Sequence, residues 1–219
     1  GGDMGAHVWG PAYLRDVLLQ HWRLTGWSMD WYAGLPVYRF YMVVPALAVV
    51  ALNLVLPYGI AFKIVVVSGL VAFPTCVYVM GRVNKLLYPL PELMVIGATM
   101  FLFDESFTIY GGNIASTMAG EFSHSIALAF AVLGLGFFAR GLDDGKHRGW
   151  AALFIALSAL SHGIVLLFVF GGVALMLLFW IQPKMEGFRD NESVVFGVKV
   201  IGLAVLLSSF WVIPFVTSH

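Results

Sequence analysis

Acidic and imidazole side chains occur at three places in a chain that is otherwise strongly apolar. Asp3 is followed four residues later by His7, so the two side chains would share one face of a helix. A carboxylate there can act as a general base, with His7 as its neighbour or as a substrate contact. The alternative is that Asp3 only caps a helix N-terminus. The spacing alone leaves both readings open.

A second polar group follows the sequence Tyr110-Gly111-Gly112. The two glycines break the chain, and the next residue, Asn113, can cap a new helix. A polar stripe then occupies positions i, i+4, i+8 and i+11 of that helix: Asn113, Thr117, Glu121 and His124. Because such a stripe cannot face lipid, we expect it to face the bundle interior or a water-filled cavity. Helix–helix hydrogen bonding is the alternative, and free N–H groups at the helix start would suit a phosphate.

The third polar site is His162, inside the apolar run 150–181. This run is too long for one membrane span of about 20 residues and short for two, so it predicts a helical hairpin broken at Ser161-His162-Gly163. His162 is then either a ligand or an interfacial, hydrogen-bonded residue. Carboxylate-bridged metal sites in bundles use two Glu-x-x-His motifs, and only Glu121 and His124 form one. We therefore expect no tightly bound metal or other cofactor, while a divalent cation held loosely through a substrate phosphate stays open.

The composition indicates that lipid is the main solvent. Charged residues make up 11% of the chain and apolar residues 60%, with a mean hydropathy of +0.90, whereas soluble domains carry about 25% charged residues. The formal net charge is zero, so no nucleic-acid partner is expected. The single cysteine, Cys76, lies in an apolar run and has no partner for an intrachain disulfide. The chain starts without Met and ends after an apolar stretch, which we read as part of a longer protein.

Residues 1–38 predict surface helices, and the family resemblance given below implies that this segment is extracytoplasmic. Pro11 can begin a helix that runs to about Trp22. Its apolar side would hold Leu14, Val17, Leu18 and Trp22, and its polar side Arg15, Asp16, Gln20 and Arg23. This pattern is typical of a helix lying on a membrane surface. The following residues 26–34, which include Asp30 and Trp31, predict an aromatic-rich loop at headgroup depth.

Residues 39–219 predict about seven membrane segments: 40–57, 60–80, 90–107, 120–139, 150–162, 164–181 and 195–217. The positive-inside rule assigns five residues to the cytoplasm: Arg140, Lys146, Arg148, Lys184 and Arg189. The segment 104–123 carries no Lys or Arg and should face outward. Arg82 and Lys85 conflict with this topology, because two full spans at 40–80 would place them on the same side as residues 1–38. Either one of those spans does not cross fully, or the two residues lie outside.

Three motifs together resemble a known family: Gly-Gly-Asp-x-Gly-Ala-His at residues 1–7, Asp-Trp-Tyr-Ala-Gly-Leu-Pro at 30–36, and Tyr-Gly-Gly-Asn-Ile-Ala-Ser-Thr-Met-Ala-Gly-Glu-Phe-Ser at 110–123. They are similar to the bacterial and archaeal membrane proteins described as 6-pyruvoyl-tetrahydropterin synthase-related, over residues 1 to about 181. The layout of that family is in turn similar to the glycosyltransferase C superfamily. Those enzymes place an acidic residue in the first outward loop and take sugars from polyprenyl-phosphate donors.

The resemblance implies a fold and an activity. The fold would be an all-α, polytopic transmembrane helical bundle, forming one module over residues 1–219. Asp3 would be the catalytic carboxylate, acting as general base, of a glycosyltransferase in the cell membrane that works at the outer face on a glycan or lipid acceptor of the cell envelope. The lipid phosphate would lie near the helix that starts at Asn113, with Arg15 or Arg39, and Trp27, Trp31 or Tyr110 would stack on sugars or anchor in headgroups. The chain has one acidic residue where related enzymes have an Asp-x-Asp pair, and nothing in the resemblance accounts for His124.

Two other classes of protein stay open from the sequence. A transporter or flippase of a lipid-linked precursor would use the same polar stripe as a pathway. A non-catalytic membrane scaffold would use it only for helix packing.

Overall fold

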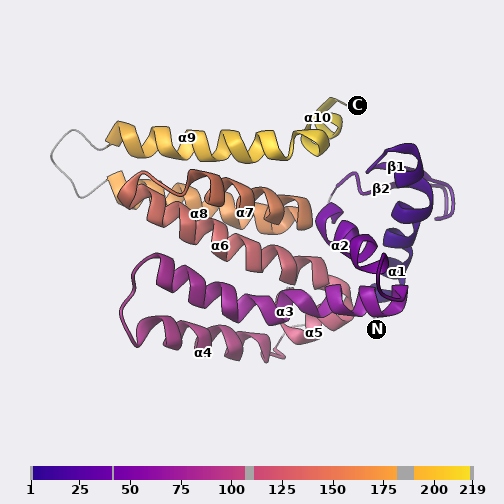
Figure 1. The fold of residues 1–219 in the computed structure, drawn as a ribbon, viewed down its shortest axis with the longest axis horizontal. Helices are drawn as coiled ribbons and strands as arrows, with labels where there is room; N and C mark the ends of the chain where they lie inside the picture. The colour runs from indigo at the N-terminus through magenta and orange to yellow at the C-terminus, as the bar shows by residue number, and fades with distance from the viewer. Residues whose placement is uncertain (1, 41, 107–110, 182–189, 218–219) are drawn as a thin grey trace.

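The computed structural model describes residues 2–40, 42–106, 111–181 and 190–217. Within them, six helices run along the long axis of the molecule (Figure 1): α3 (Tyr58–Val83), α4 (Leu90–Leu102), α6 (Phe122–Asp144), α7 (Arg148–Ser161), α8 (Gly163–Ile181) and α9 (Asp190–Leu207). A smaller N-terminal unit, formed by residues 2–40 and 42–53, lies across one end of this bundle. Helices α5 (Ile114–Ser116) and α10 (Ser209–Thr217) lie at the same end.

Small residues allow α6 and α7 to pack closely at the centre of the bundle. Ala127 and Ala131 of α6 are buried together with three alanines of α7, namely Ala151, Ala152 and Ala156. The Ser158 hydroxyl also donates a 3.0 Å hydrogen bond to the Ala127 carbonyl. Close backbone approach through Ala and Ser is how helices associate where no water is present to drive them together.

Two helices among the described residues are long and apolar enough to cross a bilayer. They are α3, with 26 residues, and the run Ile114–Asp144, which ends in α6. The remaining long helices place large apolar side chains on their outer faces, for example Leu167 and Phe168 of α8. Such exposed apolar faces fit a lipid environment.

The span predicted at 40–57 is wrong as a full crossing. Helix α2 covers only Val43–Asn53, which at 1.5 Å per residue is about 16 Å, against a hydrocarbon core of about 30 Å. A helix of this length agrees with the alternative in which one of the two segments at 40–80 does not cross fully. The loop between α3 and α4 lies at one end of the bundle and the N-terminal unit at the other (Figure 1).

The N-terminal helix begins earlier than predicted. Helix α1 covers Met4–Tyr13 and contains Pro11, which was expected to start it. Because proline lacks an N–H group and crowds the preceding turn, the chain widens into a π-helical turn, η1 (Leu14–Leu18), and ends as a 3-10 turn, η2 (Leu19–His21). The altered register buries Leu14 and Leu18 but exposes Val17 and Trp22, so the four predicted apolar residues do not form one buried face.

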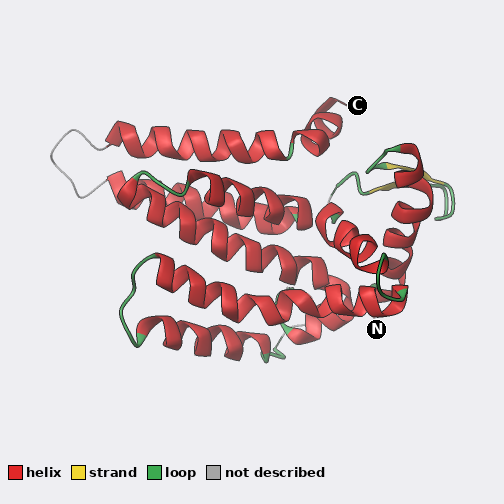
Figure 2. Cartoon of the chain, viewed as in Figure 1, coloured by secondary structure: helices red, strands yellow, loops and turns green. Residues whose placement is uncertain are grey.

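The predicted aromatic loop is a small antiparallel hairpin. Strand β1 (Gly26–Ser28) pairs with β2 (Leu35–Val37), as Figure 2 shows beside α1. Val37 packs on Leu14 and Leu18 and on Ala46 of α2. The hairpin is therefore the exception to the predicted all-α fold among the described residues.

Candidate functional site

Helix α6 is entered through an irregular turn that carries most of the predicted polar residues. Asn113 caps α5, as predicted: its side-chain oxygen accepts a 2.7 Å hydrogen bond from the Ser116 amide, and its Nδ2 donates to the Asp104 carbonyl at 2.8 Å. The chain then forms a π turn, η3 (Thr117–Glu121), before α6 begins. The cap thus fixes where this irregular turn starts.

Gly120 breaks the predicted polar stripe. Its φ of 138° is not helical, and only glycine adopts that region readily. Before Gly120, the Thr117 side chain is buried, and its hydroxyl makes a short hydrogen bond with the Ser125 hydroxyl. A single stripe is therefore wrong, because the regular 3.6-residue repeat does not continue through the kink. Only Glu121 and His124 remain at the site described next.

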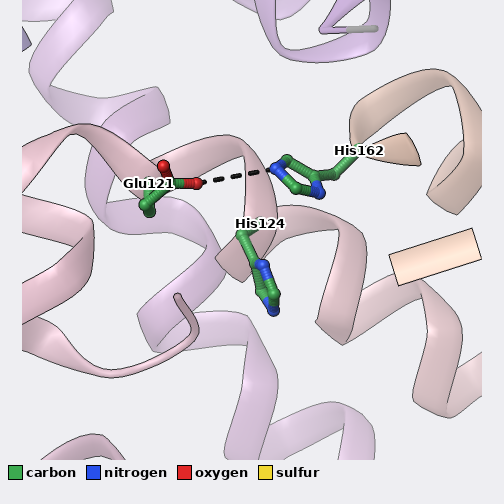
Figure 3. Close-up of side chains that lie close together, drawn as sticks. All are labelled: Glu121, His124 and His162. Atoms are coloured by element: carbon green, nitrogen blue, oxygen red, sulfur yellow. Dashed lines mark ion pairs between the residues drawn. The ribbon is translucent and has the colours of Figure 1, made fainter. Parts of the chain in front are cut away.

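Glu121, His124 and His162 meet at the end of the bundle nearest the N-terminal unit. Nε2 of His162 lies 3.5 Å from Oε2 of Glu121, and Figure 3 shows the carboxylate directed at the imidazole. The His124 and His162 ring centroids are 5.0 Å apart. One ligand atom from each of the three residues lies within 4.8 Å of the others. We call these three residues the Glu-His-His cluster.

His162 reaches the cluster because the predicted hairpin break is present. Helix α7 ends at Ser161, and α8 begins at Gly163. The residue between them has an extended backbone, with φ −155° and ψ 121°. Its side chain is buried, while that of Glu121 is 38% exposed. The carboxylate thus connects a buried imidazole with the molecular surface.

The N-terminal residues pack directly against this kink. Asp3 occupies the N-cap position of α1 but makes no side-chain cap hydrogen bond. A Cβ added to Gly120 would lie 3.2 Å from the Asp3 Cβ, so the two backbones are in contact. His7, one turn further, packs edge-on against Phe122 with ring centroids 5.7 Å apart. Burial lowers the pKa of His7, against the opposing charges of Asp3 and Glu121.

An aromatic cavity adjoins His7 on the side of the N-terminal unit. It has a volume of about 320 Å³, and its lining includes His7, Phe122, Trp9 and Trp31. The volume lies within the range of about 300–1,000 Å³ that is usual for small-molecule sites. Trp9 also stacks on Tyr13 and lies 6.0 Å from Trp31, centroid to centroid. Sequence patterns did not single out Trp9, and Phe122 appeared only within the motif at residues 110–123, because the cavity joins distant parts of the chain.

Two of the predicted substrate-binding residues outside the Glu-His-His cluster, Arg15 and Asp30, are held in separate networks. Arg15 pairs with Asp16 at 2.6 Å, donates to the Asn53 side chain, and lies over the Tyr58 ring, so its charge is already used in a separate network. Asp30 accepts a hydrogen bond from the Ser28 hydroxyl within the hairpin. Tyr110 lies outside the described residues.

The mostly helical fold and its two long apolar helices are consistent with a membrane protein. The chain belongs to the 6-pyruvoyl-tetrahydropterin synthase-related domain family of membrane proteins, whose family model matches residues 32–219. The match includes the Glu-His-His cluster, while Asp3 and His7 precede it. No curated protein matches this chain. No solved structure matches it either.

Proposed function

We propose that this protein is a multi-pass membrane glycosyltransferase, which moves a sugar from a polyprenyl-phosphate donor to a cell-envelope acceptor at the outer membrane face. The observation that carries the proposal is the convergence of Asp3 and His7 with Glu121, His124 and His162 at one end of the bundle. Ionisable groups at membrane depth are costly and usually functional. A purely structural bundle has no need to gather five of them.

Asp3 is the proposed general base. Its carboxylate removes the proton of the acceptor hydroxyl, and the acceptor oxygen attacks the anomeric carbon of the sugar. The bond between that carbon and the phosphate oxygen breaks, and polyprenyl phosphate leaves with the bonding electron pair. Asp3 suits this role because its side chain is exposed and is not used as a helix cap, so the carboxylate can face a substrate.

The aromatic cavity is the proposed sugar subsite. Trp9 and Trp31 line it together with His7, and the flat faces of tryptophan rings pack against the apolar faces of sugars. His7 lies at the boundary between this cavity and the kink at Gly120. A sugar in the cavity would therefore present its reactive carbon toward Asp3.

The experiment that tests this proposal follows sugar transfer by the full-length protein in proteoliposomes. The probe is an undecaprenyl-phosphate hexose with a labelled sugar, supplied with an envelope-lipid extract as acceptor. Wild type should release polyprenyl phosphate, and Asp3→Asn should lower the rate at least about 100-fold, the lower range for loss of a general base. Asp16→Asn is the control, because Asp16 is also acidic and exposed but pairs with Arg15.

Two results would overturn the assignment. Equal rates for wild type and Asp3→Asn would exclude Asp3 as the base. Movement of the intact labelled lipid between leaflets, without release of polyprenyl phosphate, would indicate a flippase instead of an enzyme.

A further inference from the structure

Two imidazoles and one carboxylate lie together at the start of α6, and the ion pair between two of them does not account for the third. Glu121 and His162 satisfy one another at 3.5 Å. His124 adds a second imidazole, with its ring centroid 5.0 Å from that of His162. A Glu–His pair of this kind gains little from a further half-buried imidazole, whereas a metal ion needs three or more ligands.

We propose that Glu121, His124 and His162 form a mononuclear site for a divalent first-row transition ion, with Zn²⁺ as its representative. Two histidines and one glutamate are a ligand set used by catalytic zinc sites, which leave a fourth position open. Imidazole nitrogen suits zinc and its neighbours in the row, while Mg²⁺ prefers oxygen ligands alone. The site is thus of a different kind from a cation held only through a substrate phosphate.

The distances fit this ligand set after a small contraction. Bonds of about 2.0–2.1 Å to a tetrahedral ion place neighbouring ligand atoms roughly 3.4 Å apart. The Glu121–His162 pair already has this separation, at 3.5 Å. The three ligand atoms lie within 4.8 Å of one another, so His124 needs to move by little more than a side-chain rotation.

The surrounding backbone packs against the third ligand, His124. Gly111 has φ +81°, and a Cβ added there would lie 2.4 Å from Cγ of His124. The peptide at this turn therefore packs directly on the imidazole, and only glycine leaves room for it. His162 is held by the α7–α8 break, and Glu121 by the kink at Gly120.

Bridged metal sites in helical bundles are built from two Glu-x-x-His motifs, which this chain lacks. A mononuclear site needs one such motif and one further ligand, and His162 supplies that ligand from a distant part of the sequence. Water or a phosphate oxygen would take the fourth position. A role of the metal ion in sugar transfer rests on the proposed function, whereas metal binding itself does not.

Metal content of the purified full-length protein tests the proposal. After treatment with a chelator, the protein in detergent is titrated with Zn²⁺ in the presence of excess Mg²⁺, and bound metal is counted by elemental analysis. We expect about one ion per chain with nitrogen and oxygen neighbours in the X-ray absorption spectrum. Anaerobic titration with Fe²⁺ identifies which of the two ions binds more tightly.

Variants locate the ion. Glu121→Gln and His162→Asn should each weaken binding at least about 10–100-fold, the loss seen when only an outer-shell partner is removed. His147→Ala is the matched control, because His147 lies 3.6 Å from Asp144 at the other end of α6 and offers a similar imidazole–carboxylate pair. Folding of each variant is checked by its elution as a single detergent-solubilised species.

Wild-type protein that takes up no stoichiometric Zn²⁺ or Fe²⁺ would overturn the proposal, whatever the variants do. An ion that stays bound in Glu121→Gln and is lost in His147→Ala would also overturn the proposal. Bound metal without sugar transfer would leave the metal site standing and refute the proposed function. Sugar transfer that depends on Asp3 in protein without bound metal would leave the proposed function standing and refute the metal site.

Discussion

Nε2 of His162 lies 3.5 Å from Oε2 of Glu121, and this contact joins the break between α7 and α8 to the kinked start of α6. Each half of the pair depends on a departure from regular helix: an extended residue at 162 and a glycine with φ 138° at 120. Backbone irregularity of this kind is tolerated at membrane depth where it is buried in protein or lines a cavity. The irregular segments of this bundle therefore mark the site.

Gly120→Ala should destabilise the protein and displace Asp3. An alanine there would be held at φ 138° and would place its Cβ 3.2 Å from the Cβ of Asp3 and the amide of Met4. Backbone strain of this type costs about 1–3 kcal/mol. Thermal unfolding in detergent measures the stability, and protease cleavage near the N-terminus reports release of the first helix. Gly97→Ala is the control: an added Cβ meets nothing within 4 Å on α4, so that variant should be at least as stable as wild type.

His7 should make the stability of the protein fall in mild acid. Burial lowers the pKa of folded His7 below the ordinary value of 6.5, even though the nearby Asp3 and Glu121 carboxylates act to raise it. Above about pH 6.5 both folded and unfolded His7 are neutral, so this group adds no pH dependence. As the pH falls below that value, the unfolded state binds the proton first, and the free energy of unfolding decreases.

The melting temperature measured from about pH 7.5 to about pH 5.5 tests this statement. Wild type should lose more stability over this range than His7→Gln, which keeps a polar side chain but has no titratable ring. The same decrease in both proteins would show that other groups cause it.

The two ends of the bundle should lie on opposite sides of the membrane. Arg23 lies in the N-terminal unit, and Lys146 lies between α6 and α7 at the other end (Figure 1); both are exposed. In a Cys76→Ala background, an impermeant maleimide added to intact cells should label Arg23→Cys but not Lys146→Cys. Lys146→Cys should be labelled only after the cells are opened. Labelling of both residues in intact cells would contradict the proposed topology.

Local features were predictable from the sequence. The break at His162 followed from the length of an apolar run, and the cap at Asn113 followed from its position after two glycines; both are confirmed. These signals work because each depends on a few neighbouring residues. Membership of the family, suggested by three short motifs, is confirmed over residues 32–219.

Features that depend on tertiary contacts were missed. A periodic pattern assumes one helix, so it could not predict that Gly120 would turn Thr117 away from Glu121. Pro11 is a common first residue of a helix, yet here it lies within one, because the widened turn after it buries Leu14 and Leu18 in the N-terminal core. The predicted loops place His162 and residues 113–124 at one end of the bundle, but spacing alone does not show that the His162 imidazole contacts Glu121.

The most direct test of the central claim is an experimental structure of the full-length protein in a lipid nanodisc, with bound undecaprenyl-phosphate sugar. The account predicts density for the sugar in the cavity lined by Trp9 and Trp31, with its phosphate between Asp3 and the Glu-His-His cluster. Donor lipid bound elsewhere, with Asp3 facing only solvent or packed protein, would contradict the account.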